Sequence, residues 1–447
     1  MWMAQPLLRR KLHRRSAHEP GYGQAVEERF GHYSTAVPLH LGPTVWIHSV
    51  SLGETRAAAV LVAALRAHLP GMRLLLSHGT ATGRAEGFKL LRPGDLQVWQ
   101  PWDTSGAVAR FLAHFKPDLG VLMETEVWPN LVAGCQTAGV KLALVNARLS
   151  DKSLRQAERL PWLARPAFAA LTAVWAQTPQ DAKRLQKLGA TVKGVMGNLK
   201  FDAAPDPAQL ERGRAWRVQI TQPVVMFASS REGEELVFLE AIKASRPLAH
   251  SKSAPIDTNS IATQVQWLIV PRHPQRFEAV AALIESQGFN VQRRTTWPEV
   301  GPVNAGTIGS VGAKGSENGP TVWLGDSVGE MALYYGLADL AMLGGSFEPL
   351  GGQNLIEAAA CGCPVIMGPH TFNFTEAAEQ ALAAGAAQRV TNMGQAVAQA
   401  SALARDPKQL CLAKKAATDF ARAHRGAAQQ LAQALSGLLA EPSRAKP

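Results

Sequence analysis

Short apolar runs alternate with longer amphipathic segments through the first half of the chain. The apolar runs occupy residues 44–50, 72–77, 96–100, 118–124, 141–148, 172–177 and 191–197. Between them, segments such as 54–69 and 104–115 repeat apolar residues at the spacing of a helix. Continuous apolar strands separated by helices are typical of a parallel sheet covered on both faces. This half therefore predicts one doubly wound domain.

The same rhythm resumes after a break at 203–208, where Pro205 and Pro207 indicate a linker. The apolar runs of the second series are 223–229, 266–270, 321–324, 339–344, 364–368 and 387–390. We predict an α/β protein with two Rossmann-like, doubly wound domains facing a central cleft. Its parts are a basic N-terminal segment at 1–34, a first domain at 35–204 and a second domain at 205–447.

Three further segments depart from this rhythm. Residues 245–264 and 297–320 are rich in Ser, Gly, Pro and Asn and have no hydrophobic period, so we expect surface insertions there. Residues 408–439 predict two Ala-rich helices.

Composition places the chain among folded globular proteins, with 46% hydrophobic and 18% charged residues. The four cysteines, at positions 135, 361, 363 and 411, are too few for a disulfide framework and indicate a reducing compartment. No stretch of 18 apolar residues suggests a spanning helix. We therefore expect a cytoplasmic protein that rests at most on a membrane surface.

The formal net charge is +11, and basic residues are concentrated at the start of the chain. They are Arg9, Arg10, Lys11, Arg14 and Arg15, within fifteen residues that contain no acid. Such a patch favours an anionic surface, either lipid or nucleic acid, although a basic tail that only aids solubility has the same composition.

The first predicted strand ends in a polar segment with a candidate base, Glu54. In open α/β sheets, ligands bind beyond the carboxyl ends of strands, and Glu54 follows such an end. Ser51 and Glu54 also have the spacing of a capping box, in which the two side chains only bond the free backbone amides at the start of a helix. The residues alone leave both interpretations open.

Two carboxylates, Glu124 and Glu126, follow another buried strand. Because they are two residues apart, we expect them to point to the same side of a strand. They fit a metal or acid/base pair, or a structural role in bonding backbone amides. Arg148, at the end of the next predicted strand, is a candidate ligand for an anion.

In the second half, the strongest local pattern is a glycine-rich segment at 344–357. Its glycines free backbone N–H groups, Asn354 fits a helix N-cap, and Glu357 follows one turn later, where it can bond ribose hydroxyls. Pro271 and Pro274 flank Arg272 after another strand and hold its guanidinium in place. No Walker lysine or early G-x-G-x-x-G accompanies these features, which disfavours ATPase and hydride-transfer functions.

An ordered series of motifs resembles the family of 3-deoxy-D-manno-octulosonic acid (Kdo) transferases of lipopolysaccharide assembly. The motifs are HSVSLGE, METEVWPN, NARLS, GNLKFD, PRHPQRF, LGDSVGEM, GGQNLIEAAA and MGPHTFNF. They span the chain from about residue 20 to residue 374. The resemblance implies a GT-B glycosyltransferase that moves Kdo, with inversion, from CMP-Kdo to a hydroxyl of the lipid A precursor lipid IVA.

The same resemblance assigns roles to residues. It implies that Glu54 is the catalytic base, in an acceptor domain at 35–204. The residues implied to contact CMP, in a donor domain at 205–447, are Pro271, Arg272, Gly329, Glu330, Met331, Asn354, Leu355, Ile356 and Glu357. No Asp-x-Asp motif is present, so we expect no metal and no cofactor, with Arg272 and the helix after Asn354 stabilising the departing CMP.

Some positions depart from the family pattern. Arg231 and Gln353 stand where histidines are common, 77–83 differs from the family's Thr-rich version, and a short basic segment replaces an apolar N-terminal anchor. We therefore expect peripheral binding to the anionic cytoplasmic face of the inner membrane.

Two rival functions are a sugar-nucleotide epimerase of related fold and a nucleic-acid-binding protein. The second leaves the strand-end motifs unexplained, and the basic segment lacks interleaved aromatic residues, so we expect no nucleic-acid partner.

Overall fold

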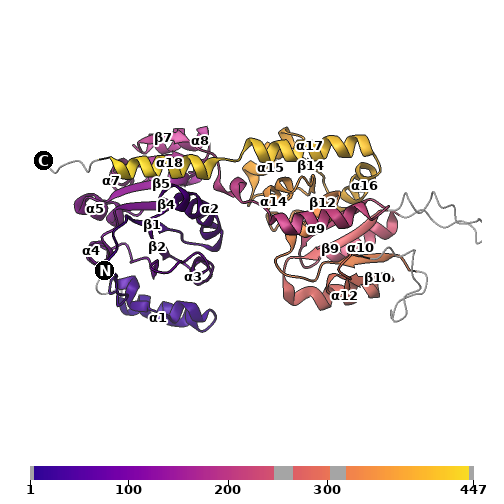
Figure 1. Cartoon of the computed structure of the whole chain (residues 1–447), viewed down its shortest axis with the longest axis horizontal. Coiled ribbons are helices and arrows are strands. Elements are labelled where there is room, and N and C mark those ends of the chain that lie inside the picture. The colour runs from indigo at the N-terminus through magenta and orange to yellow at the C-terminus, as the bar shows by residue number, and fades with distance from the viewer. Residues whose placement is uncertain (1–4, 246–264, 303–318, 442–447) are drawn as a thin grey trace, which may run out of the picture. The chain divides into compact units, whose positions relative to one another are not determined.

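The computed structural model describes residues 5–245, 265–302 and 319–441. The chain forms two compact units (Figure 1), Met1–Ala203 together with His424–Pro447, and Ala204–Ala423. The break between them falls in the predicted linker at 203–208. The two predicted insertions, 245–264 and 297–320, lie mostly outside the described residues.

The first unit contains a seven-stranded parallel sheet in the order β3-β2-β1-β4-β5-β6-β7. Its strands are β1 (Thr44–His48), β2 (Arg73–His78), β3 (Leu96–Trp99), β4 (Leu119–Met123), β5 (Lys141–Ala147), β6 (Ala173–Ala176) and β7 (Val192–Val195). Every residue of β1, β2 and β4 is buried, as expected for strands covered on both faces. The predicted doubly wound sheet is confirmed.

Helices cover both faces of this sheet. They are α1 (Gln5–Ser16), η2 (Pro20–Gly23), η3 (Val26–Phe30), α2 (Leu52–His68), α3 (Ala81–Phe88), α4 (Ser105–Phe115), α5 (Pro129–Ala138), α6 (Asp151–Glu158), α7 (Pro161–Ala169), α8 (Pro179–Lys187), η4 (Leu199–Asp202) and α18 (Ala427–Ala440). Side-chain oxygens of Ser51, Thr80, Thr104 and Thr178 accept from backbone amides and cap α2, α3, α4 and α8.

The last helix, α18, belongs to the first unit, which corrects the predicted second domain of 205–447. Leu431 and Leu435 of α18 share a core with Leu61 and Leu65 of α2. The Asp202 carboxylate accepts from backbone N–H groups at the start of α18. The sequence showed an apolar helical stripe but not the surface against which it packs.

The N-terminal segment is also part of the first unit, rather than a separate segment at 1–34. Leu12, Tyr22 and Trp99 form a small buried cluster. Glu28 Oε2 accepts from the backbone N–H of Trp99 at 2.7 Å, and the Arg29 guanidinium lies 3.9 Å from the Trp99 ring centroid. Long-range contacts therefore tie this segment to β3.

The second unit contains another seven-stranded parallel sheet, in the order β10-β11-β9-β8-β12-β13-β14. Its strands are β8 (Val224–Ser230), β9 (Gln266–Pro271), β10 (Asn290–Arg293), β11 (Thr321–Leu324), β12 (Leu340–Leu343), β13 (Val365–Met367) and β14 (Ala387–Arg389). The sequence did not predict β10, because this edge strand has a single apolar residue, Val291.

The helices of the second unit are α9 (Pro207–Val218), α10 (Glu234–Ala244), η5 (Pro274–Arg276), α12 (Phe277–Ser286), η6 (Arg294–Thr296), α13 (Met331–Leu337), α14 (Leu355–Ala360), α15 (Thr375–Ala383), α16 (Met393–Ala404) and α17 (Pro407–Ala423). Helices α9 and α13 pack closely, because a Cβ at Gly213 would lie 2.1 Å from Leu333 O. Within the described residues, no helix combines the length and apolar composition needed to cross a bilayer.

Both sheets reverse their strand order at one internal position. In the first unit β1 and β4 are neighbours at this position, and in the second unit β8 and β12 are. Ligands of open α/β sheets bind at such switch points, beyond the carboxyl ends of the two strands. The fold therefore directs attention to the residues that follow β1, β4, β8 and β12.

Candidate active site

Glu54 lies just after β1, in the first turn of α2. Its carboxylate accepts from the backbone N–H of Val50 at 2.8 Å and from Ser51 Oγ at 3.0 Å. In return Ser51 Oγ caps the helix by accepting from the Glu54 N–H at 3.4 Å. The predicted capping box is confirmed, although the carboxylate bonds the amide one residue before the N-cap.

Burial raises the pKa of Glu54 from 4.5 to about 7, and the nearby carboxylates of Glu126 and Glu124 raise it further, against the hydrogen bonds from Val50 and Ser51. The carboxyl therefore exchanges its proton near neutral pH, as a general base requires. Capping and proton transfer are compatible. Each carboxylate oxygen of Glu54 accepts one hydrogen bond, from Val50 or Ser51, and keeps a further lone pair that can bind a proton.

Glu124 and Glu126 follow β4, across the switch point from Glu54. Glu124 is buried, its backbone is left-handed (φ +55°), and its carboxylate pairs with Arg148 Nε at 3.0 Å and Lys200 Nζ at 3.7 Å. Glu126 accepts from the Trp128 indole N–H at 2.8 Å, and burial raises its pKa. The ion pairs give Glu124 a structural role, and they bring the predicted anion ligand Arg148 to the same place.

The expectation that Glu124 and Glu126 point to one side of a strand is wrong. β4 ends at Met123, so neither residue is in extended strand geometry. Among the described residues, no three His, Cys, Asp or Glu side chains are placed to hold a metal ion together.

Sequence reasoning missed a buried histidine at the end of β1. His48 Nδ1 lies 2.9 Å from Ser77 Oγ, and burial lowers the pKa of His48 to about 3, so its ring is neutral. His48 Nε2 is buried and has no hydrogen-bond partner in the described part of the chain. Its position in the HSVSLGE motif was the available signal, but an apolar strand gave no reason to single it out.

Asn146, at the end of β5, was also missed. Its backbone is left-handed (φ +50°), and its Oδ1 accepts from the backbone N–H of Leu199 at 3.1 Å. This contact positions the segment that carries Lys200 beside Glu124. The motifs NARLS and GNLKFD, distant in sequence, are therefore joined by a hydrogen bond.

In the second unit, Glu234 anchors the glycine-rich loop. Its carboxylate accepts from the backbone N–H groups of Arg231 at 2.9 Å, Gly345 at 2.8 Å and Phe347 at 3.3 Å. The side chain is 1% exposed. Glu234 therefore joins the segment after β8 to the segment after β12, across the switch point.

The two positions that depart from the family pattern lie at this same loop. A Cβ built on Gly345 would lie 3.3 Å from Gln353 Nε2 and 3.6 Å from Arg231 Cγ. Both side chains therefore border one glycine, whose backbone is left-handed (φ +67°). The departures at Arg231 and Gln353 therefore affect one place in the second unit.

Two of the predicted donor residues are neighbours of one buried side chain. Arg272 and Glu357 both act electrostatically on the Tyr335 hydroxyl, whose pKa burial raises. Arg272 is exposed, whereas Glu357 is half-buried. Asn354 caps α14 by accepting from the Ile356 N–H at 3.2 Å, as predicted.

The remaining predicted donor residues are held by backbone geometry. Gly329 is left-handed (φ +83°), and its carbonyl accepts from Gln209 Nε2 at 3.0 Å. Glu330 pairs with Arg294 at 3.0 Å, just before Met331 opens α13. The predicted positions Pro271, Leu355 and Ile356 are buried, so they offer mainly backbone atoms to a ligand.

Comparison with known proteins gives consistent matches. Residues 24–203 match the family model described as "3-Deoxy-D-manno-octulosonic-acid transferase (kdotransferase)". The 3-deoxy-D-manno-octulosonic acid transferase of Bordetella pertussis is 46% identical over 418 residues, 92% of this chain and 91% of its own length. The enzyme of the same name from Haemophilus influenzae is 31% identical over 379 residues, 84% of this chain and 82% of its own length.

Solved structures with little sequence identity share the architecture. A glycosyltransferase from Rickettsia africae superposes with a TM-score of 0.53 at 14% identity, covering 90% of this chain and all of its own. A UDP-GlcNAc 2-epimerase from Neisseria meningitidis does so with a TM-score of 0.54 at 13% identity, covering 88% of this chain and all of its own. These likenesses confirm the GT-B type of α/β fold and do not separate transferase from epimerase.

Proposed function

Because the chain belongs to the 3-deoxy-D-manno-octulosonic acid (Kdo) transferase family, we propose that it moves Kdo from CMP-Kdo to a hydroxyl of lipid IVA. The reaction inverts the anomeric centre, releases CMP and needs no metal. The chain is a glycosyltransferase of lipopolysaccharide biosynthesis, and the substrate detail and the mechanism are the proposal.

The observation that carries the proposal is the state of Glu54. A sugar hydroxyl is a poor nucleophile until a positioned group removes its proton as the new bond forms. Glu54 supplies a carboxylate with a pKa of about 7, fixed by hydrogen bonds to Val50 and Ser51 at a topological switch point. A base with a pKa of about 7 is about half ionised at pH 7 and binds a proton strongly enough to take it.

The proposed step is a single displacement. Glu54 takes the hydroxyl proton while the acceptor oxygen bonds to the anomeric carbon of Kdo. The bond from that carbon to the phosphate oxygen breaks, and CMP leaves with the electron pair. Because the nucleophile attacks from the face opposite to CMP, the configuration inverts.

In this proposal the second unit holds the donor. The Arg272 side chain is exposed and has no hydrogen-bond or ion-pair partner among the described residues, so its guanidinium is available to the CMP phosphate. The loop anchored by Glu234 leads into α14, the helix that begins after Asn354. A guanidinium and a helix N-terminus stabilise the charge that develops on a departing monophosphate, in place of a metal.

The proposed location is the cytoplasmic face of the inner membrane, bound peripherally through anionic lipid. Arg10, Lys11, Arg14 and Arg15 are exposed on α1, although Arg15 also lies over the Tyr22 ring. Arg9, by contrast, pairs with Glu27 and lies over the Phe30 ring. Four of the five clustered charges are therefore presented to a surface.

The test is mass spectrometry of the lipid product from CMP-Kdo and lipid IVA. The proposal expects lipid IVA to gain the mass of Kdo, with CMP released only when lipid IVA is present. Release of CMP that does not depend on the lipid, with no lipid product, would contradict it and favour an epimerase-like or hydrolytic activity.

A further inference from the structure

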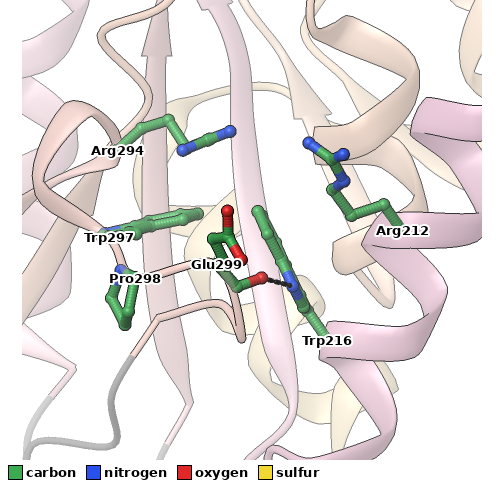
Figure 2. Close-up of a pocket in the computed structure, with 6 residues that line it drawn as sticks. All are labelled: Arg212, Trp216, Arg294, Trp297, Pro298 and Glu299. Carbon is green, nitrogen blue, oxygen red and sulfur yellow. Dashed lines mark hydrogen bonds between the residues drawn. The ribbon is translucent and has the colours of Figure 1, made fainter.

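The second unit contains a pocket outside the glycine-rich loop, between α9 and the segment that follows β10. Its volume is about 340 Å³, at the small end of the range for ligand pockets. The lining residues are Arg212, Trp216, Arg294, Trp297, Pro298 and Glu299. Figure 2 shows two indole rings as its walls, with both guanidinium groups toward one end and the Glu299 carboxylate between the rings.

The aromatic walls are fixed in place. Trp216 and Trp297 are 4% and 7% exposed, and their ring centroids are 6.0 Å apart at 75°. The Trp216 indole N–H donates to the backbone carbonyl of Glu299 at 3.1 Å, and Trp297 packs edge-on against Trp323. The two rings are in edge-to-face contact, and the Arg294 guanidinium lies over both, 5.1 Å from the Trp216 centroid and 5.7 Å from the Trp297 centroid. Their exposed edges give the pocket a rigid apolar wall, which suits a ligand with an aromatic ring.

The guanidinium groups have unused hydrogen-bond donors. Arg294 pairs with Glu330 through one terminal nitrogen, while its buried Nε has no acceptor among the described residues. Arg212 is exposed and has no hydrogen-bond or ion-pair partner in the same part of the chain. An arginine fork matches carboxylate and phosphate oxygens, so the missing partner is an anionic acceptor.

We propose that this pocket is a second binding site, for a small organic anion with a carboxylate or phosphate next to an aromatic ring. The ring packs against the exposed edges of Trp216 and Trp297, and the anion bonds Arg212 and Arg294. The exposed Glu299 carboxylate lies inside the pocket, so it competes with the ligand's anion for the guanidinium groups.

The pocket is connected to the predicted donor loop through one ion pair. Arg294 donates to Glu330 at 3.0 Å, and Ser327 Oγ donates to the same carboxylate. An anion bonded to Arg294 competes with Glu330 and loosens the loop at 329–331. Ligand and CMP therefore weaken each other's binding by the same factor. This coupling, unlike the pocket itself, rests on the proposed function of that loop.

The experiment is calorimetry on the full chain with phenyl phosphate and benzoate as probes. At least one probe binds about tenfold more tightly than either phenol or inorganic phosphate, which supply the ring or the charge alone. The better probe identifies phosphate or carboxylate as the preferred anion. Equal binding of probes and controls would overturn the site.

Two substitutions of exposed residues change probe affinity in opposite directions. Arg212→Gln weakens binding about fivefold or more, because it removes a charged donor, and Glu299→Gln strengthens it, because it removes the competing anion. Arg422→Gln, on the exposed side of α17, is the matched control and leaves the affinity unchanged. Unaltered probe affinity in both pocket variants would also overturn the site.

CMP titration with and without probe, at a probe concentration equal to its dissociation constant for the parent pocket, separates coupling from competition. A probe that binds the donor site itself weakens CMP binding equally in the parent and in Arg212→Gln. Coupling from the pocket weakens CMP binding in the parent and loses most of this effect in Arg212→Gln, whose weaker pocket is mostly empty at that concentration. An effect of equal size in both proteins would overturn the coupling. Failure of CMP to bind in the absence of probe would contradict the proposed function and leave the pocket result standing.

Discussion

Two glutamates occupy equivalent places in the two units and do different things. Glu54 follows β1 in Ser-Leu-Gly-Glu, and Glu234 follows β8 in Arg-Glu-Gly-Glu, each at the switch point of its sheet. The Glu54 side chain is half-buried and its carboxylate bonds only Val50 and Ser51, four and three residues earlier in the sequence. Glu234 is fully buried and bonds backbone amides of a loop more than one hundred residues away.

The difference lies in the number and distance of the hydrogen bonds. Burial raises the pKa of Glu234 as well, but its carboxylate accepts from three backbone amides, so it holds two segments of the structure together. A carboxylate with two local bonds and a pKa of about 7, as in Glu54, is available for chemistry. The same local motif therefore yields a structural residue in one unit and a candidate catalytic residue in the other.

The largest expected effect is the loss of transfer in Glu54→Gln. A glutamine still accepts from the Val50 amide and can donate to Ser51 Oγ, but it cannot take a proton. Turnover should fall by about 10²–10⁴-fold, the range for losing a general base. Steady-state assays with CMP-Kdo and lipid IVA measure it, with the melting temperature and CMP affinity as controls. More than half of the parent turnover in this variant would refute the assignment.

The same substitution at Glu234 should damage stability instead. A glutamine at position 234 has one oxygen for three backbone donors and faces at least one of them with an amide N–H. A buried donor without a partner costs about 1–3 kcal/mol, so the free energy of unfolding should drop by that amount. Denaturant titration of Glu234→Gln beside Glu54→Gln measures the contrast. Equal stability of the two variants would remove the distinction between the residues.

A smaller effect is expected from Arg272→Gln. Removing a charge-assisted bond to phosphate should raise the donor KM and weaken CMP binding by about tenfold, while leaving the fold unchanged because Arg272 is exposed. Calorimetry with CMP measures the change, and Arg422→Gln is the control for loss of one exposed arginine from the second unit. Unchanged CMP affinity would remove Arg272 from the donor site.

The smallest effect is expected on membrane binding. Replacing Arg10, Lys11 and Arg14 by glutamine should weaken sedimentation with anionic vesicles, at about 1 kcal/mol per basic residue near the surface, and salt should reduce the difference. Turnover of detergent-dispersed acceptor should stay nearly constant.

Its control removes the same charge elsewhere in the first unit. Lys183, Lys187 and Lys193 are exposed, and their replacement by glutamine changes net charge equally. Equal vesicle binding by both triple variants would show that α1 is not a specific membrane contact.

The periodicity of apolar residues predicted both sheets because buried parallel strands are apolar throughout. It missed β10, where one apolar residue sufficed at a sheet edge, and it assigned α18 to the wrong unit. Helix α18 is amphipathic by sequence, but only the structure shows that its leucines meet those of α2. Local pattern specifies that a face is buried, not which surface buries it.

The site was predicted to the extent that it is local. The capping of α2 by Ser51 and of α14 by Asn354 follows from spacing alone. The pairing of Glu124 with Lys200 and the anchoring of Gly345 by Glu234 join segments that are far apart in sequence, so no local pattern contains them. The pKa of Glu54 likewise depends on burial and on carboxylates that follow another strand.

The most direct test of Glu54 as the base is the pH dependence of kcat/KM. The base must be ionised, and burial raises its pKa from 4.5 to about 7, so the rate is full above this pH and falls as pH drops through it. The residual activity of Glu54→Gln controls for titration of the substrates, since a limb caused by lipid or donor phosphates appears in both proteins. The account predicts an acid limb with an apparent pKa near 7 in the parent and no such limb in Glu54→Gln. A parent rate that stays constant down to about pH 5, or the same limb in both proteins, would contradict it.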